Sequence, residues 1–148
     1  MYLKASDTVS GRLGRVYATI DGRNEEMLYV KNITATAIKH KTQVPVIGSA
    51  SVQYRAGGWS GRGTMSIYYA TSVFRRLMID YIKTGKDTYF DLVVENDDPS
   101  SSAGGQTVML KGVNLDSIAL ARIDIDAEVL DEKIEFTFDD AELLEAFK

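Results

Sequence analysis

Apolar and polar residues alternate along much of this chain, and a period of two is typical of strands that bury one face. Alternation or β-branched runs cover residues 15–20, 33–39, 64–70, 89–95, 107–114, 117–128 and 133–138. Asp21 and Gly22 stand between apolar runs, which is a strong hairpin signal, and we expect the return strand to start near Met27. The pattern therefore predicts a mainly β fold.

One segment has a helical period instead. Thr71 or Ser72 is suited to be its N-cap, and Gly85 stands just past its expected end. The apolar residues between them recur at three-to-four spacing: Val73, Phe74, Leu77, Met78, Tyr81 and Ile82. The other side carries Arg75, Arg76, Asp80 and Lys83. We expect an α-helix over about 72–84 that packs on the open face of a sheet.

Two segments show neither period. Residues 1–14 are mostly polar with glycines towards their end, which predicts an N-terminal arm. Four glycines lie within residues 57–63 beside the only tryptophan, and we expect a long mobile loop over about 40–62. Residues 96–105 predict a flexible connection, and the tail at 141–148 one helical turn. The sum is a single domain over 1–148, a β-barrel or sandwich with one flanking helix.

The composition excludes several kinds of site. The 148-residue chain suits one domain and has no cysteine, which removes disulfides, thiolate metal sites and thiol nucleophiles. Its one histidine, His40, excludes a site built from two imidazoles. No apolar run approaches the roughly 20 residues of a membrane helix, and the N-terminus lacks the apolar core of a signal peptide. We expect a protein made inside the cell, with no membrane segment, cofactor, metal or enzyme activity.

Charge is divided unevenly along the chain. Residues 1–86 carry a net charge of +8 and residues 87–148 a net charge of −12, which leaves −4 overall. A basic half is typical of nucleic-acid binding, but an acidic half of the same domain would repel that partner. Two interpretations stay open: the halves interleave and their charges mix, or one surface of a subunit complements another surface of the next copy.

Three carboxylates alternate with apolar residues in the expected strand at 117–128. Asp124, Asp126 and Glu128 should therefore point to one face. Such a row is typical of the solvated face of a half-buried strand, and it could also hold a hard cation such as Ca²⁺. In a closed ring of subunits the same side chains would form an acidic lumen face, which repels nucleic acid and lets it slide.

The glycine-rich segment mixes aromatic and basic residues, namely Tyr54, Arg55, Trp59 and Arg62. This mixture is one way to stack single-stranded bases, although no aromatic alternation continues onto a neighbouring strand. The same residue types also concentrate at the centres of protein interfaces. We favour the second interpretation, in which these side chains anchor a subunit into its neighbour.

Several stretches together resemble one known family. The opening stretch at 8–17 (TVSGRLGRVY) and Asp21-Gly22 resemble the start of the tail tube proteins of PBSX-like prophages and related contractile phage tails. The block at 61–69 (GRGTMSIYY), which leads into the helix, shares this resemblance. The closing stretches at 113–116, 123–128 and 134–140 (VNLD, IDIDAE, IEFTFDD) are the most similar.

The resemblance implies a structural virion protein. Six copies would form a ring, and stacked rings would make the hollow inner tube of a contractile tail or bacteriocin-like particle. The N-terminal arm and the segment at 40–62 would reach neighbouring subunits, with Arg12, Arg15, Tyr54, Arg55, Trp59 and Arg62 as candidate interface residues.

The partners it implies are other copies of the chain, a sheath protein, a baseplate or initiator, a tail terminator and a tape measure protein in the lumen. The subunit would be made in the bacterial cytoplasm and bind no specific nucleic acid. The alternative is a monomeric β-barrel module that binds a small ligand or single-stranded nucleic acid.

Overall fold

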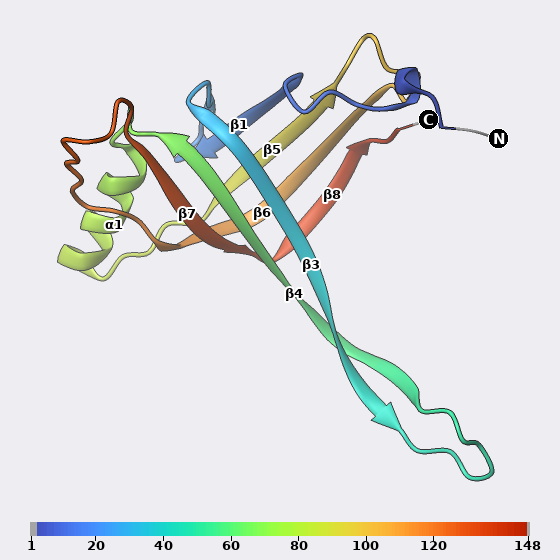
Figure 1. Cartoon of the computed structure of the whole chain (residues 1–148). Helices are drawn as coiled ribbons and strands as arrows, with labels where there is room; N and C mark the ends of the chain where they lie inside the picture. Colours follow the sequence, from blue (N-terminus) through green and yellow to red (C-terminus); the bar gives the residue numbers. More distant parts are fainter. Residues whose placement is uncertain (1–2, 148) are drawn as a thin grey trace.

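The computed structural model describes residues 3–147, and these fold mainly into antiparallel strands (Figure 1). In chain order the elements are η1 (Ala5–Asp7), β1 (Gly14–Ile20), β2 (Arg23–Glu26), β3 (Val30–Val44), β4 (Gln53–Tyr68), α1 (Val73–Thr84), β5 (Phe90–Asp97), β6 (Gly105–Ser117), β7 (Asp131–Phe138) and β8 (Asp140–Glu145). A mainly β fold with one α-helix is therefore confirmed for the described residues.

The strands form one curved sheet in the order β2-β1-β5-β6-β7-β4-β3, and β8 also pairs with β6. The two end strands, β2 and β3, do not pair with each other in the part of the chain described, so the sheet stays open. Strand β6 is where the sheet bends, because its first part pairs with β8 and its last part with β7. Gly112 sits at this bend with φ +66°, and a Cβ there would overlap the carboxylate of Asp139.

The predicted Asp21-Gly22 turn joins β1 to β2, and both residues have positive φ, of 50° and 79°. Positive φ at both central positions matches the right-handed twist of a two-residue hairpin. The return strand starts at Arg23, earlier than expected, because the pairing of Ile20 with Arg23 begins directly after the turn.

The core lies on the inner face of the curved sheet. Strands β4 and β7 run side by side, so that Met65 pairs with Ile134 and Gly63 with Phe136. These side chains pack with buried residues of β1, β5 and β6: Val16, Ala18, Phe90, Leu92, Leu110 and Val113. The alternation predicted for residues 64–70 thus places Met65 and Ile67 in the core, where both are fully buried.

Helix α1 follows the predicted bounds and packs Phe74 against Phe90 of β5, with ring centroids 5.8 Å apart. Gly85 ends the helix in the left-handed conformation, and its N–H donates to the Tyr81 carbonyl oxygen. Two expectations were wrong. Arg75 belongs to the buried side of the helix, because it pairs with the buried carboxylate of Glu132. Tyr81 and Ile82, which were expected on the apolar face, are exposed.

The expectation of a mobile loop at 40–62 was wrong for most of these residues. Residues 40–44 and 53–62 continue β3 and β4, so that only the tip between them lacks strand structure. The two strands form a long hairpin that projects well away from the rest of the molecule (Figure 1). Both faces of its outer part are exposed, so the hydrophobic alternation that identifies a half-buried strand is missing there.

Three further expectations were wrong in whole or in part. Residues 118–130 form an irregular loop, in which Ile123 and Ile125 are exposed although they alternate like core residues. The tail was expected to form a helical turn, but it continues as strand β8 up to Glu145, because its backbone pairs with β6. The expected flexible connection at 96–105 is partly strand, and Asp98 within it is buried. Residues 1, 2 and 148 of the expected single domain and arm lie outside the described residues.

Candidate assembly surface

The outer hairpin, residues 38–59, is exposed at every position. It lies beyond the last residues of β4 that pair with β7, at Gly61, so only β3 and β4 support each other there. A two-stranded hairpin alone in water is marginally stable at best. The outer hairpin therefore has little support from the rest of its own chain.

A bulge re-aims the outer hairpin. The register shifts between Lys39 and Lys41, opposite Gly57 and Gly58, and Gly58 has φ +141°. A bulge of this kind leaves one residue unpaired and increases the local twist. Two of the glycines that suggested a mobile loop, Gly57 and Gly58, thus lie at a bulge within a hairpin.

The whole hairpin is free of carboxylates. No Asp or Glu occurs between Glu26 and Asp80, whereas the outer hairpin contains Lys39, Lys41 and Arg55. In the core the basic and acidic halves interleave, since β4 pairs with β7 and β1 with β5. The outer hairpin is where positive charge extends away from the acidic half of the chain.

The tip of the outer hairpin is apolar as well as exposed. Ile47 is fully exposed, and four further large side chains around it are exposed too: Val44, Val46, Val52 and Tyr54. Gly48, with φ +80°, forms the turn that presents Ile47. Large apolar side chains that are exposed close together in the sequence are typical of an interaction site.

The structure does not bring the six predicted interface residues together. Tyr54 and Arg55 lie in the outer hairpin, paired with Gln43 and Thr42. Trp59 lies at its base, where its ring centroid is 6.0 Å from that of Phe138, and Arg62 reaches to 3.7 Å from the Asp116 carboxylate.

Arg12 and Arg15 belong to a different surface. Together they line a cleft with Glu26 and Glu95 between the β1 side and the β3 side of the open sheet. Hydrogen bonding to Tyr17 raises the pKa of Arg15, and the negative charges of Glu26 and Glu95 add to this effect.

The N-terminal arm is fastened to the loop that follows β5. Asp98 is buried and accepts hydrogen bonds from the backbone N–H of Ser10 and of Ser100, each at 2.9 Å. Ser102 donates its backbone N–H to the Ser6 carbonyl oxygen and its hydroxyl to Asp7, which lowers the pKa of Asp7. In the single chain the arm therefore lies along its own domain.

The predicted acidic row lies on the loop 118–130, not on a strand. Its conformation is local: the N–H of Asp126 donates to the Asp124 carboxylate at 3.0 Å, which is an Asx-type turn. Within residues 3–147 no group of three His, Cys, Asp or Glu side chains is placed to hold a metal ion. In that same span no helix has the length and apolar character to cross a membrane.

Comparison with known proteins decides the family. The family model described as phage tail tube protein matches residues 1–145 of this chain. The chain belongs to the phage tail tube protein family. The resemblance to tail tube proteins of PBSX-like prophages is thereby confirmed.

Two relatives of this tail tube protein come from Bacillus subtilis strain 168. The phage-like element PBSX protein XkdM is 41% identical over 145 residues, which cover 98% of this chain and 96% of the relative. The uncharacterized protein YqbM is 40% identical over 148 residues, which cover 100% and 98%. Among solved structures, a chain of the PVC sheath–tube complex of an extracellular contractile injection system has a TM-score of 0.71 at 11% identity, covering 96% of this chain and 94% of that one.

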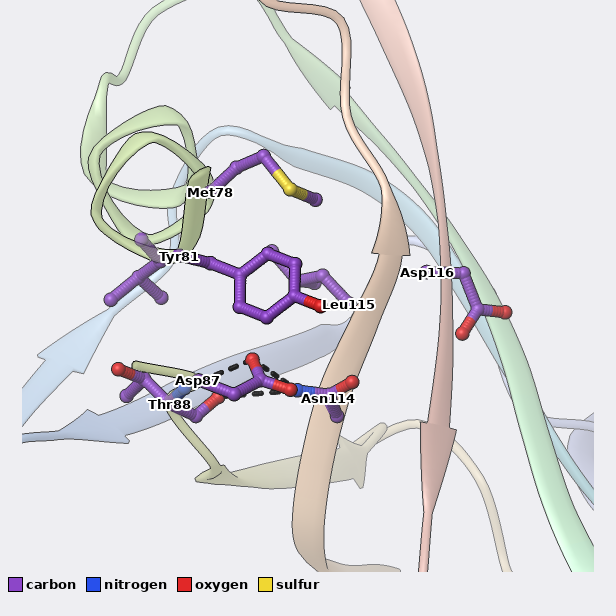
Figure 2. Close-up of a pocket in the computed structure, with 8 residues that line it drawn as sticks. Met78, Tyr81, Asp87, Thr88, Asn114, Leu115 and Asp116 are labelled. Atoms are coloured by element: carbon purple, nitrogen blue, oxygen red, sulfur yellow. Dashed lines mark hydrogen bonds between the residues drawn. The ribbon is translucent and has the colours of Figure 1, made fainter. Parts of the chain in front are cut away.

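Sequence reasoning missed two surfaces of this tail tube protein. The apolar tip was hidden because residues 44–52 were assigned to a mobile loop, although valine and isoleucine are frequent there. The second is a pocket between α1 and the end of β6 (Figure 2). Its residues come from distant parts of the chain, and no local pattern links them.

Proposed function

We propose that this chain is the repeating subunit of a hollow tail tube, in which copies form rings, six to a ring, and the rings stack. The observation that carries the proposal is the outer hairpin, whose apolar tip has no partner in its own chain. Membership in the tail tube family supports a tube subunit, and the ring number comes from the resemblance alone.

The shape of the subunit favours propagation. A hairpin that projects from one side of the subunit and binds elsewhere on the next copy makes a heterologous contact. Such contacts generate closed rings where the rotation closes and open filaments where it does not. A tube of stacked rings needs both kinds of contact, and large apolar side chains are also exposed outside the hairpin, among them Ile123 and Ile125.

Charge complementarity between copies is the second element of the proposal. The positive outer hairpin would meet the acidic half of the neighbouring copy, and Arg55 and Arg62 would contribute on this side of the subunit. Arg12 and Arg15, which line the cleft, would form a second basic surface for an acidic surface of a neighbour. Asp124, Asp126 and Glu128 stay candidates for an acidic lumen face, now contributed by a loop.

The tube would act as a structural conduit without enzyme activity, passing DNA or puncturing an envelope as part of a virion or tail-like particle made in a bacterial cytoplasm. Solved proteins of similar fold occur in a baseplate, a sheath–tube complex and a tube-terminating cap. By analogy, the partners would be a sheath protein, a baseplate or initiator and a terminator, with a tape measure protein in the lumen.

A shortened hairpin tests the proposal. Replacing residues 42–55 by Asn-Gly joins Lys41 to its partner Ala56 through a two-residue turn and leaves the core untouched. We expect this variant to stay folded and to remain monomeric at concentrations where the intact chain forms rings and tubes, as seen by negative-stain electron microscopy. Tube formation by the shortened chain at the same concentration would refute a role for the hairpin in assembly.

A further inference from the structure

The N-terminal arm is attached to its domain through one loop. Within residues 3–147, the hydrogen bonds from residues 4–10 to a distant part of the chain all end on Asp98 or Ser102, in the loop between β5 and β6 (Figure 1). The Ser102 N–H donates to the Ser6 carbonyl oxygen at 2.8 Å, and the Ser10 N–H donates to the Asp98 carboxylate at 2.9 Å. The arm therefore depends on a small set of polar contacts for its position.

Apolar burial adds little to this attachment. Leu3 is 78% exposed, no residue of η1 is buried, and Val9 is only half-buried. None of the buried core residues comes from residues 3–15. Segments with few buried apolar contacts open locally, at a small fraction of the free energy that unfolds the core. The arm, which joins β1 through a turn at Gly11 and Arg12, is therefore separable from the core.

Asp98 is the residue on which the attachment depends most. It is 6% exposed, and its two carboxylate oxygens have different partners. Oδ1 accepts from the Ser100 N–H within the loop, whereas Oδ2 accepts from the Ser10 N–H of the arm. A hydrogen bond to a carboxylate is roughly twice as strong as one between neutral groups. The bond from Ser102 to the Asp7 carboxylate is exposed, so water competes for it, and the buried bond to Asp98 contributes more.

We propose that residues 3–10 form a strap, fastened by Asp98, which opens and closes as one unit while the sheet stays folded. In the open state the Ser6 carbonyl oxygen and the Ser10 N–H lose their partners and are free to bind another chain, whereas the core contacts are kept. The strap thus lets the arm change partners without unfolding the domain. The inference goes beyond the proposed function, because it concerns the single subunit and does not depend on rings or tubes.

Amide hydrogen exchange of the unassembled chain, followed residue by residue by NMR, tests the strap. The variant D98N keeps the shape of the side chain and removes its negative charge. D97N is the matched control, because Asp97 is the preceding residue and is exposed. A second variant, S102A, removes the hydroxyl bond to Asp7 and leaves Asp98 in place.

In the parent we expect the Ser10 and Ser102 amides to exchange at similar corrected rates, about 100-fold faster than the amides of β4 and β7. D98N should speed exchange about tenfold at both amides and leave β4 and β7 unchanged, and D97N should match the parent. S102A should also speed exchange at Ser10, because the strap opens as one unit.

Exchange at Ser10 as slow as in β4 would overturn the proposal, because the arm would then open only with the core. Unchanged exchange in D98N would overturn it too, as would an effect confined to Ser10 or one that is equal in β4 and β7. The measurement is made at concentrations where the chain is monomeric. Its outcome is therefore separate from that of the tube proposal.

Discussion

Arg75 of α1 and Glu132 of β7 form an ion pair inside the domain. The guanidinium Nη1 lies 2.9 Å from one carboxylate oxygen and 3.0 Å from the other, and the side chains are only 10% and 2% exposed. Arg75 also donates to the carbonyl oxygens of Thr71 and Ala119 and lies 4.2 Å from the centroid of the Tyr69 ring. This one side chain thus joins the helix, β7 and the loop 118–130.

Replacing one member of this ion pair should lower the free energy of unfolding more than replacing both members. R75M leaves the Glu132 charge buried without a partner, and we expect the free energy of unfolding to fall by about 3–5 kcal/mol. R75M/E132L replaces both charges by apolar groups and should recover most of that loss. Urea unfolding of the two variants and the parent measures the difference. Equal destabilisation by the single and double variants would contradict the account.

Gly63 should tolerate no side chain. A Cβ there would lie closer than 3.0 Å to three carbons of the Phe136 ring, which is buried and unable to move aside. We expect G63A to lower the free energy of unfolding by about 1–3 kcal/mol through overpacking. G57A is the matched control on the same strand, because the nearest atom to its Cβ would be 3.7 Å away. Equal thermal midpoints for the two variants would show that the ring is not fixed.

Acid should weaken the domain below about pH 4. A hydrogen bond from Lys31 lowers the pKa of Asp131, and one from Ser102 lowers the pKa of Asp7. A carboxylate with a lowered folded-state pKa adds stability above its unfolded pKa, and this stability is lost as pH falls through the folded pKa.

Urea midpoints at a series of pH values between about 5 and 2 measure this loss. Lys31 Nζ lies 2.6 Å from Asp131 Oδ2. D131N should therefore remove the part of the acid dependence that comes from this ion pair. An acid dependence that D131N leaves unchanged would contradict the assignment.

Reversal of positive charge should block tube growth without unfolding the chain. We expect the combined variant R12E/R15E/R55E/R62E to remain folded and to form no tubes, because the basic surfaces would no longer complement the acidic half of a neighbour. Light scattering follows growth, and circular dichroism checks the fold. Growth at the parent rate would refute charge complementarity between copies.

Local signals were strong enough to predict much of the fold. The Asp21-Gly22 turn and the helix that ends at Gly85 depend on backbone conformations that few residues adopt, and both occur where the sequence indicates them. The alternation over Met65 and Ile67 reflects a face that is buried along most of its length. Where one stretch of chain determines its own conformation, the sequence was sufficient.

The features that the sequence did not predict depend on contacts between distant residues, or lie in segments that pack on no core of their own. Arg75 was placed on the solvated side of α1 because its partner, Glu132, lies 57 residues away. Ile123 and Ile125 alternate like strand residues, but the Asp124 side chain bonds the backbone in a turn and leaves both isoleucines exposed. The α1 pocket follows no local sequence pattern, because its lining residues come from distant parts of the chain.

Electron microscopy of the purified chain over a concentration series tests the central claim most directly. The account predicts hollow rings and stacked tubes above a threshold concentration for the intact chain, and only small particles for the chain with residues 42–55 replaced. Small particles at every concentration for the intact chain, with the outer hairpin present and folded, would contradict it.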